Sequence, residues 1–402
     1  LAALVPRLGP GGMVLMHDGL GPGALRADCR ETVRLVGLLC DAIRARGWEA
    51  GPVALDEVLA VVAAGAAGRD AGPPEFPEGA MRLLEGAGVL AATVPVRGRP
   101  ARAPGEEWSL VRRVAAADGS VARILDGHLN AVERVALLAP GPLRDEELAA
   151  VATGRRRMGV WGADPLPHEG APATLEGAPG DRRISGGKVF CSGAGGIDRA
   201  LVTARDRAGR PVLALVDLSE GVAIDRDWYR GSGLRTAESH RVRFEGARVL
   251  AVLGAPGELV REPWFSRDAI RTAACWAGLA DRAAAAVLDA LAARPEIGDL
   301  EALAAGRIAG AIATIDRWLD GAAREAARAD ADLRATSVQL RAAVADACRT
   351  ILDEGTRATG SRPLVDGGAL DRCRRDLDLF LLQHRLDPMV ARLGRAAIED
   401  RG

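Results

Sequence analysis

The pattern of hydrophobic and polar positions changes its period twice along the chain. From about residue 54 to residue 150, apolar residues recur at helical spacing, interrupted by proline and glycine. Between residues 159 and 253 the helical period gives way to short β-type runs separated by glycine, proline and charged turns. After Trp264, alanine- and leucine-rich helices return and continue to Ile398. The pattern predicts helices, then a small sheet or barrel, then a helical bundle.

The individual elements follow from the same pattern. The helices expected in the first half cover residues 54–67, 80–90, 108–117 and 121–139. The β-type runs cover residues 160, 184, 189–190, 200–204, 212–216, 222–224 and 242–244. In the last part we expect the helices to be interrupted near Arg294 and Pro295 and across residues 359–368.

Four segments result, and the predicted fold class is α+β. They are an appended strand and helix at 1–52, an N-terminal helical domain at 53–157, a β-rich middle domain at 158–255 and a C-terminal helical bundle at 256–402. The chain shows no βαβ alternation and no GxGxxG motif that opens a helix after a strand. A Rossmann nucleotide site is therefore disfavoured.

Composition narrows the class of protein. Of the 402 residues, 48 % are hydrophobic and 27 % are charged, and 53 basic residues nearly balance 54 acidic ones, which is typical of a soluble globular protein. There is no basic stripe interleaved with aromatic residues, so we expect no nucleic-acid partner. No uncharged apolar run approaches the roughly 18 residues of a membrane span, and the start lacks a secretory pattern, so we expect a cytoplasmic protein. The six cysteines have no CxxC spacing, and no metal site is predicted.

Two loop-dense segments place small residues and a hydroxyl group at strand ends. They are residues 159–165 and 186–194. Glycine and alanine leave room for the backbone to approach a planar ligand closely. The alternative interpretation is a pair of ordinary β-turns.

Several motifs in a fixed order resemble the acyl-CoA dehydrogenase family. They are GGKVFCSGAGGIDRALVTAR at residues 186–205, the stretch 228–244, and the pair Arg375 and Asp376. The resemblance covers about residues 55–400. It implies an N-terminal helical domain, a middle β-barrel domain and a C-terminal four-helix bundle, with FAD between the β domain and the bundle. It also implies an acyl-CoA substrate, α,β-dehydrogenation of that acyl thioester, and a homodimer or homotetramer.

The resemblance also implies which residues contact the flavin. Trp161 and Ala163 match one segment that lines the flavin ring in the family, and Cys191 and Ser192 match the other. His128 falls on the helix before the β domain, where related proteins often let a side chain face the pocket. Arg271, near the start of the first bundle helix, is a candidate for contact with a phosphate.

The chain departs from the family at the catalytic base. The family commonly supplies a glutamate a few residues after the Arg–Asp pair, but here His384 stands in that region, between Gln383 and Arg385. An imidazole, with a pKa near 6.5, could act as the base without tuning. Two alternatives remain open: a flavin-dependent monooxygenase of the same fold, which abstracts no α-proton, and a non-catalytic relative. His384 could also be a surface or packing residue.

Residues 1–52 resemble a different family. The sequence from Gly11 to Asp18, with a helix and then Arg46, Gly47 and Trp48, is similar to the final strand and helix of NodB-type polysaccharide deacetylases. The earlier part of that barrel, with its aspartate and paired metal-binding histidines, is absent. We therefore expect neither metal binding nor amide hydrolysis from this segment.

Overall fold

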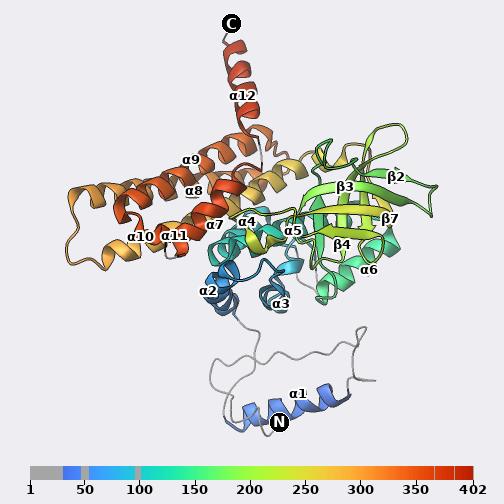
Figure 1. Cartoon of the computed structure of the whole chain (residues 1–402), viewed down its shortest axis with the longest axis horizontal. Coiled ribbons are helices and arrows are strands. Elements are labelled where there is room, and N and C mark those ends of the chain that lie inside the picture. Colours follow the sequence, from blue (N-terminus) through green and yellow to red (C-terminus); the bar gives the residue numbers. More distant parts are fainter. Residues whose placement is uncertain (1–29, 47–53, 96–100, 366, 384, 402) are drawn as a thin grey trace. The chain divides into compact units, whose positions relative to one another are not determined.

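The computed structural model describes residues 30–46, 54–95, 101–365, 367–383 and 385–401 (Figure 1). The chain divides into two compact units, residues 1–58 and residues 59–402. In the first unit, helix α1 (Arg30–Arg44) matches the helix expected there. The sequence from Gly11 to Asp18, which contains the expected strand, lies outside the described residues, as do Gly47 and Trp48 of the deacetylase-like segment. The division between the units falls within helix α2 (Leu55–Ala71).

Helices come first in the second unit, as the pattern predicts. Pro104 opens α4 at a position where a helix needs no backbone N–H, and Asp118 caps α5 by accepting a hydrogen bond from the Val121 backbone at 3.0 Å. After α2 the helices are α3 (Glu78–Gly86), η2 (Val89–Ala91), α4 (Pro104–Ala117), α5 (Gly119–Leu138) and α6 (Gly141–Ala152).

A seven-stranded sheet follows, and its pairings close on themselves. Strand β4 pairs with β2, β2 with β3, β3 with β7, β7 with β5, and β5 again with β4, while β1 flanks β4 and β6 flanks β7. The strands are β1 (Met158–Trp161), β2 (Thr174–Glu176), β3 (Arg183–Cys191), β4 (Arg199–Arg205), β5 (Pro211–Asp217), β6 (Val222–Asp225) and β7 (His240–Leu253).

Strands β4 and β5 are apolar on both faces because both faces are buried. Ala200 pairs with Val216, and both side chains belong to a core enclosed by the strands. Leu201 pairs with Leu215, and both face the other way, into a core shared with α5 and α6. Burial on both faces explains why these strands appear in the sequence as continuous apolar runs rather than as an alternation. Figure 1 shows α6 beneath the strands.

The last part of the chain is a bundle in which α7 packs against α8, α9 and α11 (Figure 1). Its helices end more often than the sequence suggests. Besides the two expected interruptions, the chain leaves helical conformation at residues 327–333, 381–383 and 385–386. The elements are η3 (Arg235–Ala237) and η4 (Glu258–Val260) ahead of the bundle, then α7 (Trp264–Ala292), α8 (Asp299–Ala326), α9 (Arg334–Thr359), α10 (Arg362–Val365), α11 (Ala369–Phe380) and α12 (Asp387–Glu399).

One glycine allows the bundle to approach the first helices. A Cβ atom at Gly278 of α7 would lie 2.0 Å from the backbone oxygen of Arg112 on α4 and 2.7 Å from the Ala115 side chain. Only glycine fits such a close crossing of two helices. This contact, with α5 packed on the sheet, brings α5, α7 and the ends of the strands together.

Candidate functional site

A cavity of about 680 Å³ lies where α5, α7 and the end of α11 meet the β domain. Four of the chain's six phenylalanine and tyrosine residues line it: Phe190, Tyr229, Phe265 and Phe380. Its volume falls within the range of roughly 300–1,000 Å³ that is typical of small-molecule sites. In a chain with so few of these residues, their concentration marks the cavity as the strongest candidate site in the part of the chain that the structure describes.

The β-domain wall consists of strand ends. Gly162 and Ala163 follow β1, and Ser192 follows β3, after Phe190, which adopts a left-handed backbone with φ 53°. The Ser192 hydroxyl lies 2.9 Å from the hydroxyl of Ser239, which also lines the cavity. The left-handed backbone of Phe190 lies at the end of β3, where Phe190 and Ser192 line the cavity.

The helical wall carries the ionisable groups. On α5, Asp126 accepts hydrogen bonds on Oδ2 from Arg123 at 3.0 Å and from Thr272 of α7 at 3.1 Å. No described residue donates a hydrogen bond to Oδ1 of this carboxylate. Burial raises the pKa of Asp126, and the positive charges of Arg123 and Arg271 only partly oppose that shift. The cavity therefore has one buried acid with a free oxygen.

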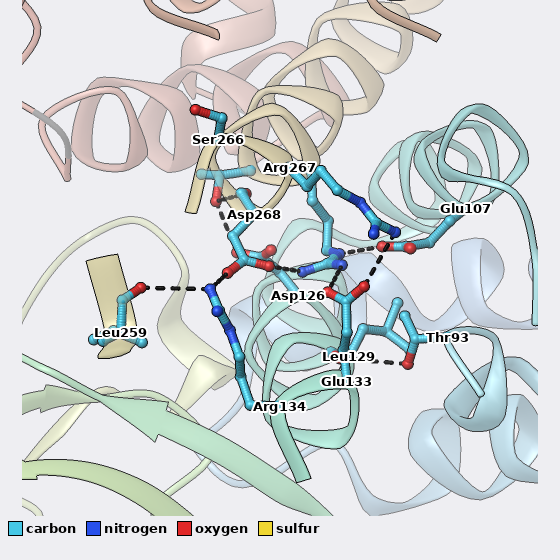
Figure 2. Close-up of polar contacts among 12 residues, drawn as sticks. Thr93, Glu107, Asp126, Leu129, Glu133, Arg134, Leu259, Ser266, Arg267 and Asp268 are labelled. Carbon is cyan, nitrogen blue, oxygen red and sulfur yellow. Dashed lines mark hydrogen bonds and ion pairs between the residues drawn. The ribbon is translucent and has the colours of Figure 1, made fainter. Parts of the chain in front are cut away.

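Behind this wall lies a buried charge network that joins α4, α5 and α7 (Figure 2). Asp268 also lines the cavity, but both of its oxygens are occupied, by Arg134 at 2.7 Å and by Arg271. Glu133 is paired with Arg267 at 3.1 Å and with Arg271 at 3.3 Å. Burial raises the pKa of Glu133 despite these partners. The network fixes the helices and leaves Asp268 no free oxygen for chemistry.

The structure places two of the flavin candidates from the sequence, Ala163 and Ser192, in the cavity wall. Trp161 is buried behind the wall, where its indole N–H donates to the Ser192 backbone oxygen at 3.1 Å. Cys191 is buried in the core of the β domain, and burial raises the pKa of its thiol well above the ordinary value. Trp161 thus holds Ser192, whereas Cys191 is an unreactive core residue.

His128 is fully buried and does not line the cavity. Its Nδ1 accepts from the Met158 backbone N–H at 2.9 Å, so Nε2 carries the proton and donates to the Leu90 oxygen at 2.9 Å. Burial lowers the pKa of His128 to about 4, and the ring is neutral near pH 7. The imidazole ties α5 to the start of β1.

Arg271 also lies away from the cavity. The side chain is fully buried, and its three guanidinium nitrogens each donate to a carboxylate, of Glu107, Asp268 and Glu133, which raises its pKa. Arg271 therefore does not present its charge to a phosphate in the cavity. His384, the candidate base, lies outside the described residues, although its neighbours Gln383 and Arg385 line the cavity.

Sequence reasoning missed the polar face of α5. Arg123, Asp126 and Asn130 are three or four residues apart on this helix, so they share one face, and all three line the cavity. Asp268 and Thr272 repeat this spacing on α7. The available signal was the helical spacing of these polar residues on each helix. His128, two positions from Asp126, does not line the cavity.

The residues around the cavity fit a flavin. Gly127, Gly162 and Ala163 leave flat, open wall, the aromatic side chains offer stacking surfaces, and Ser192 and Asn130 offer hydrogen bonds to the polar edge of such a ring. Arg123 and Arg385 are the cations in the wall that could meet a phosphate. Among the described residues no group of three or more His, Cys, Asp or Glu side chains is arranged to hold a metal ion.

Within the described ranges, no helix combines the length and the apolar character needed to cross a membrane.

Comparison with known proteins identifies the fold. No protein-family model matches the sequence, a deacetylase model included, and no curated protein matches it. Three similar solved structures are FMN-bound TdsC from Paenibacillus sp. A11-2, a nitrososynthase from Micromonospora carbonacea var. africana, and the methanesulfinate monooxygenase MsuC from Pseudomonas fluorescens.

The agreement extends over most of each chain. TdsC is 19 % identical with a TM-score of 0.74, and the alignment covers 86 % of this chain and 96 % of TdsC. The corresponding values are 20 %, 0.73, 85 % and 94 % for the nitrososynthase, and 21 %, 0.73, 86 % and 95 % for MsuC. The chain therefore shares its fold with these enzymes, the helix–sheet–helix arrangement of the acyl-CoA dehydrogenase type.

Proposed function

We propose that the protein is a flavin-dependent monooxygenase that acts on a small, flat, largely apolar molecule. The observation that carries this proposal is the composition of the cavity wall at the end of α11. Its described residues there are Leu379, Phe380, Leu382, Gln383 and Arg385, with no carboxylate among them. The C-terminal glutamate that acyl-CoA dehydrogenation commonly uses as its base has no counterpart in this part of the wall.

The two carboxylates in the wall come from other helices. Asp268 has both oxygens bound to arginine, and Asp126, on α5, has a raised pKa, so it keeps its proton to a higher pH than an exposed aspartate does. A protonated carboxyl donates a proton more readily than it abstracts one. This chemistry suits oxygenation, in which an oxygen atom must be protonated, better than removal of an α-proton.

The similar structures support the same choice. TdsC is described as a dibenzothiophene monooxygenase and MsuC as a methanesulfinate monooxygenase, and TdsC has been crystallised with FMN and with indole. The α,β-dehydrogenation of an acyl-CoA, which the family resemblance implies, stays the second candidate and depends on His384 as the base.

Each part of the wall has a role in this proposal. The chemistry that a bound reduced flavin would supply is two electrons for molecular oxygen, so that one oxygen atom would enter the substrate and the other would leave as water. Ser192 and Asn130 bind and orient the polar edge of the ring. Arg123 and Arg385 meet the phosphate. Asp126 would hold a proton at Oδ1, the oxygen to which no described residue donates a hydrogen bond. The aromatic residues Phe190, Phe265 and Phe380 exclude water and hold the substrate.

We propose FMN rather than FAD as the cofactor. The wall contains two arginines for a single phosphate, and the cavity volume suits one flavin ring with a small substrate. The measurement is a comparison of the dissociation constants of FMN and FAD, each oxidised and reduced. We expect reduced FMN to bind most tightly, and tighter binding of FAD would contradict this assignment.

A cavity-filling variant tests whether the flavin binds at this place. Ala163 is exposed in the wall, so Ala163→Phe narrows the cavity without disturbing the core. We expect it to weaken flavin binding at least about tenfold, while Ala208→Phe, at an exposed alanine in a β-domain turn, leaves binding unchanged. Equal binding by both variants would place the flavin elsewhere. The absence of any flavin binding by the unchanged protein would favour a non-catalytic relative.

A further inference from the structure

Lys188 is the only lysine in a chain with 53 basic residues, and it is buried next to the cavity wall. It lies on β3 and is 1 % exposed. Its ammonium group donates to Asp164 Oδ1 at 2.6 Å, to Thr203 Oγ1 at 2.7 Å and to the Gly162 backbone oxygen at 3.2 Å. An ammonium group has three N–H donors, so all of them are satisfied.

These bonds converge on one short segment, residues 162–164, directly after β1. Besides Lys188, the Thr203 hydroxyl donates to the Gly162 oxygen at 3.0 Å, and the Val189 backbone N–H donates to the Ala163 oxygen at 3.1 Å. Gly162 and Ala163 line the cavity. Side chains and backbone of β3 and β4 therefore hold one edge of the cavity from behind.

Burying the charged amine that holds this segment is energetically unfavourable. Burial lowers the pKa of Lys188, which means that the protein destabilises the charged form there, and the neighbouring Asp164 opposes this shift. At every other basic position the chain uses arginine. A guanidinium group is larger than an ammonium group, and all of its N–H donors lie in one plane. It therefore cannot reproduce the three hydrogen bonds that the Lys188 ammonium group makes at this compact site.

We propose that Lys188 is a positioning residue that fixes residues 162–164 in the geometry that binds the flavin. This inference rests on the proposed function, because it assigns Lys188 a role toward the proposed cofactor. Lys188 contacts neither substrate nor flavin and acts through Gly162 and Ala163.

The first test compares flavin affinity in variants of this clamp. Lys188→Arg keeps the charge and changes its shape, and Thr203→Val removes one acceptor of the ammonium group and one bond to Gly162 while leaving the lysine in place. We expect the dissociation constant of FMN to rise about tenfold or more in Lys188→Arg and about threefold in Thr203→Val. If Lys188→Arg fails to fold, Thr203→Val carries the test.

The matched control is Arg199→Gln. Arg199 is another partly buried cation of the sheet, on β4, with ion pairs to Glu147 at 3.0 Å and Asp217 at 2.7 Å, and it does not line the cavity. Its loss should lower the melting temperature and leave the dissociation constant of FMN unchanged. A purely structural role for Lys188 predicts the same result for Lys188→Arg and Thr203→Val, which would overturn the inference.

The single lysine also gives a direct spectroscopic readout. Protein grown with lysine labelled with ¹³C at Cε gives one side-chain NMR signal, which belongs to Lys188. We expect titration with FMN to shift this signal with the same midpoint as the fluorescence measurement of binding. A signal that does not shift while FMN binds would overturn the role proposed for Lys188 and leave the proposed function standing. If the unchanged protein binds no flavin, the proposed function falls and the inference falls with it.

Discussion

Helix α5 shows how neighbouring residues take separate roles. His128 points into the protein and makes two backbone contacts, whereas Asp126, two positions earlier, lines the cavity with one oxygen free of described donors. Residues two apart on a helix face different directions. His128, the candidate from the sequence, is therefore not the residue that lines the cavity. The proposed proton donor is the carboxyl group of Asp126.

Asp126→Asn tests this role. Asparagine keeps the shape of the side chain and removes the proton, so we expect oxygenation by the flavin-loaded protein to fall about 100-fold while the affinity for FMN changes little. In the unchanged protein, activity that depends on the acid form should decline as the pH rises through the raised pKa of Asp126, and this decline should be absent in the variant.

The matched control is Thr272→Val, which removes a hydrogen bond to Asp126 but keeps the carboxyl. It should retain most of the activity and the pH-dependent decline. An Asp126→Asn protein with full activity, or with an unchanged pH profile, would remove Asp126 from the mechanism.

A second buried carboxyl governs stability rather than chemistry. Asp376 on α11 accepts a hydrogen bond from the Leu234 backbone at 2.5 Å, and burial together with Asp118 and Asp70 raises its pKa to about 7 from 3.8, against the opposing charge of Arg375. Between these two values the folded protein holds a proton that the unfolded chain has lost. Its contribution to stability is therefore complete below about pH 4 and is lost as the pH rises to about 7.

Asp376→Asn should remove this dependence. The variant keeps an oxygen for the Leu234 N–H, and its free energy of unfolding relative to the unchanged protein should rise between pH 5 and pH 8 by on the order of 2–4 kcal/mol. Urea unfolding at several pH values measures it. A difference between the two proteins that stays constant with pH would show that Asp376 does not titrate in this range.

At the scale of elements, the sequence predicted those strands and helices that are visible as regular patterns of apolar residues. The apolar runs at 200–204 and 212–216 coincide with β4 and β5 because burial on both faces leaves them continuously apolar. Strand β2 was missed, since its three residues are too short for an alternation to be visible. The break at residues 327–333 was also missed, because it contains neither glycine nor proline.

The candidate site was predicted only on its β-domain side. Ala163 and Ser192 stand in loops whose composition is visible locally. The helical wall depends on pairs that are far apart in sequence, such as Asp126 and Thr272, which are separated by 146 positions. No local pattern reveals that two such residues meet, although the polar spacing on each helix points to a shared face.

The charge network that joins α4, α5 and α7 should be essential to their packing. Arg271→Met leaves Glu107, Glu133 and Asp268 short of a buried partner, and we expect it to lower the free energy of unfolding by about 3–5 kcal/mol. Arg349→Met, which breaks an exposed pair with Asp346 on α9, should cost less than about 1 kcal/mol. Equal losses in urea unfolding would contradict a structural role for the network.

At the scale of the whole molecule, fold and chemistry are separate conclusions. The helix–sheet–helix order was visible in the sequence, and similar solved structures confirm the fold over most of the chain. One fold supports more than one reaction, so the choice between dehydrogenation and oxygenation depends on the cavity wall. In that wall, the described C-terminal residues offer no carboxylate base, and α5 offers a buried acid.

The most direct measurement follows the absorption spectrum of the FMN-loaded protein in two steps. In the first step, acyl-CoA compounds of several chain lengths are added without oxygen. In the second step, reduced FMN and ¹⁸O₂ are supplied with a panel of flat apolar compounds, and the masses of the products are measured by mass spectrometry. We predict an unbleached flavin in the first step and one ¹⁸O atom in a product in the second. Bleaching by an acyl-CoA, with no ¹⁸O incorporated, would contradict the account and establish a dehydrogenase.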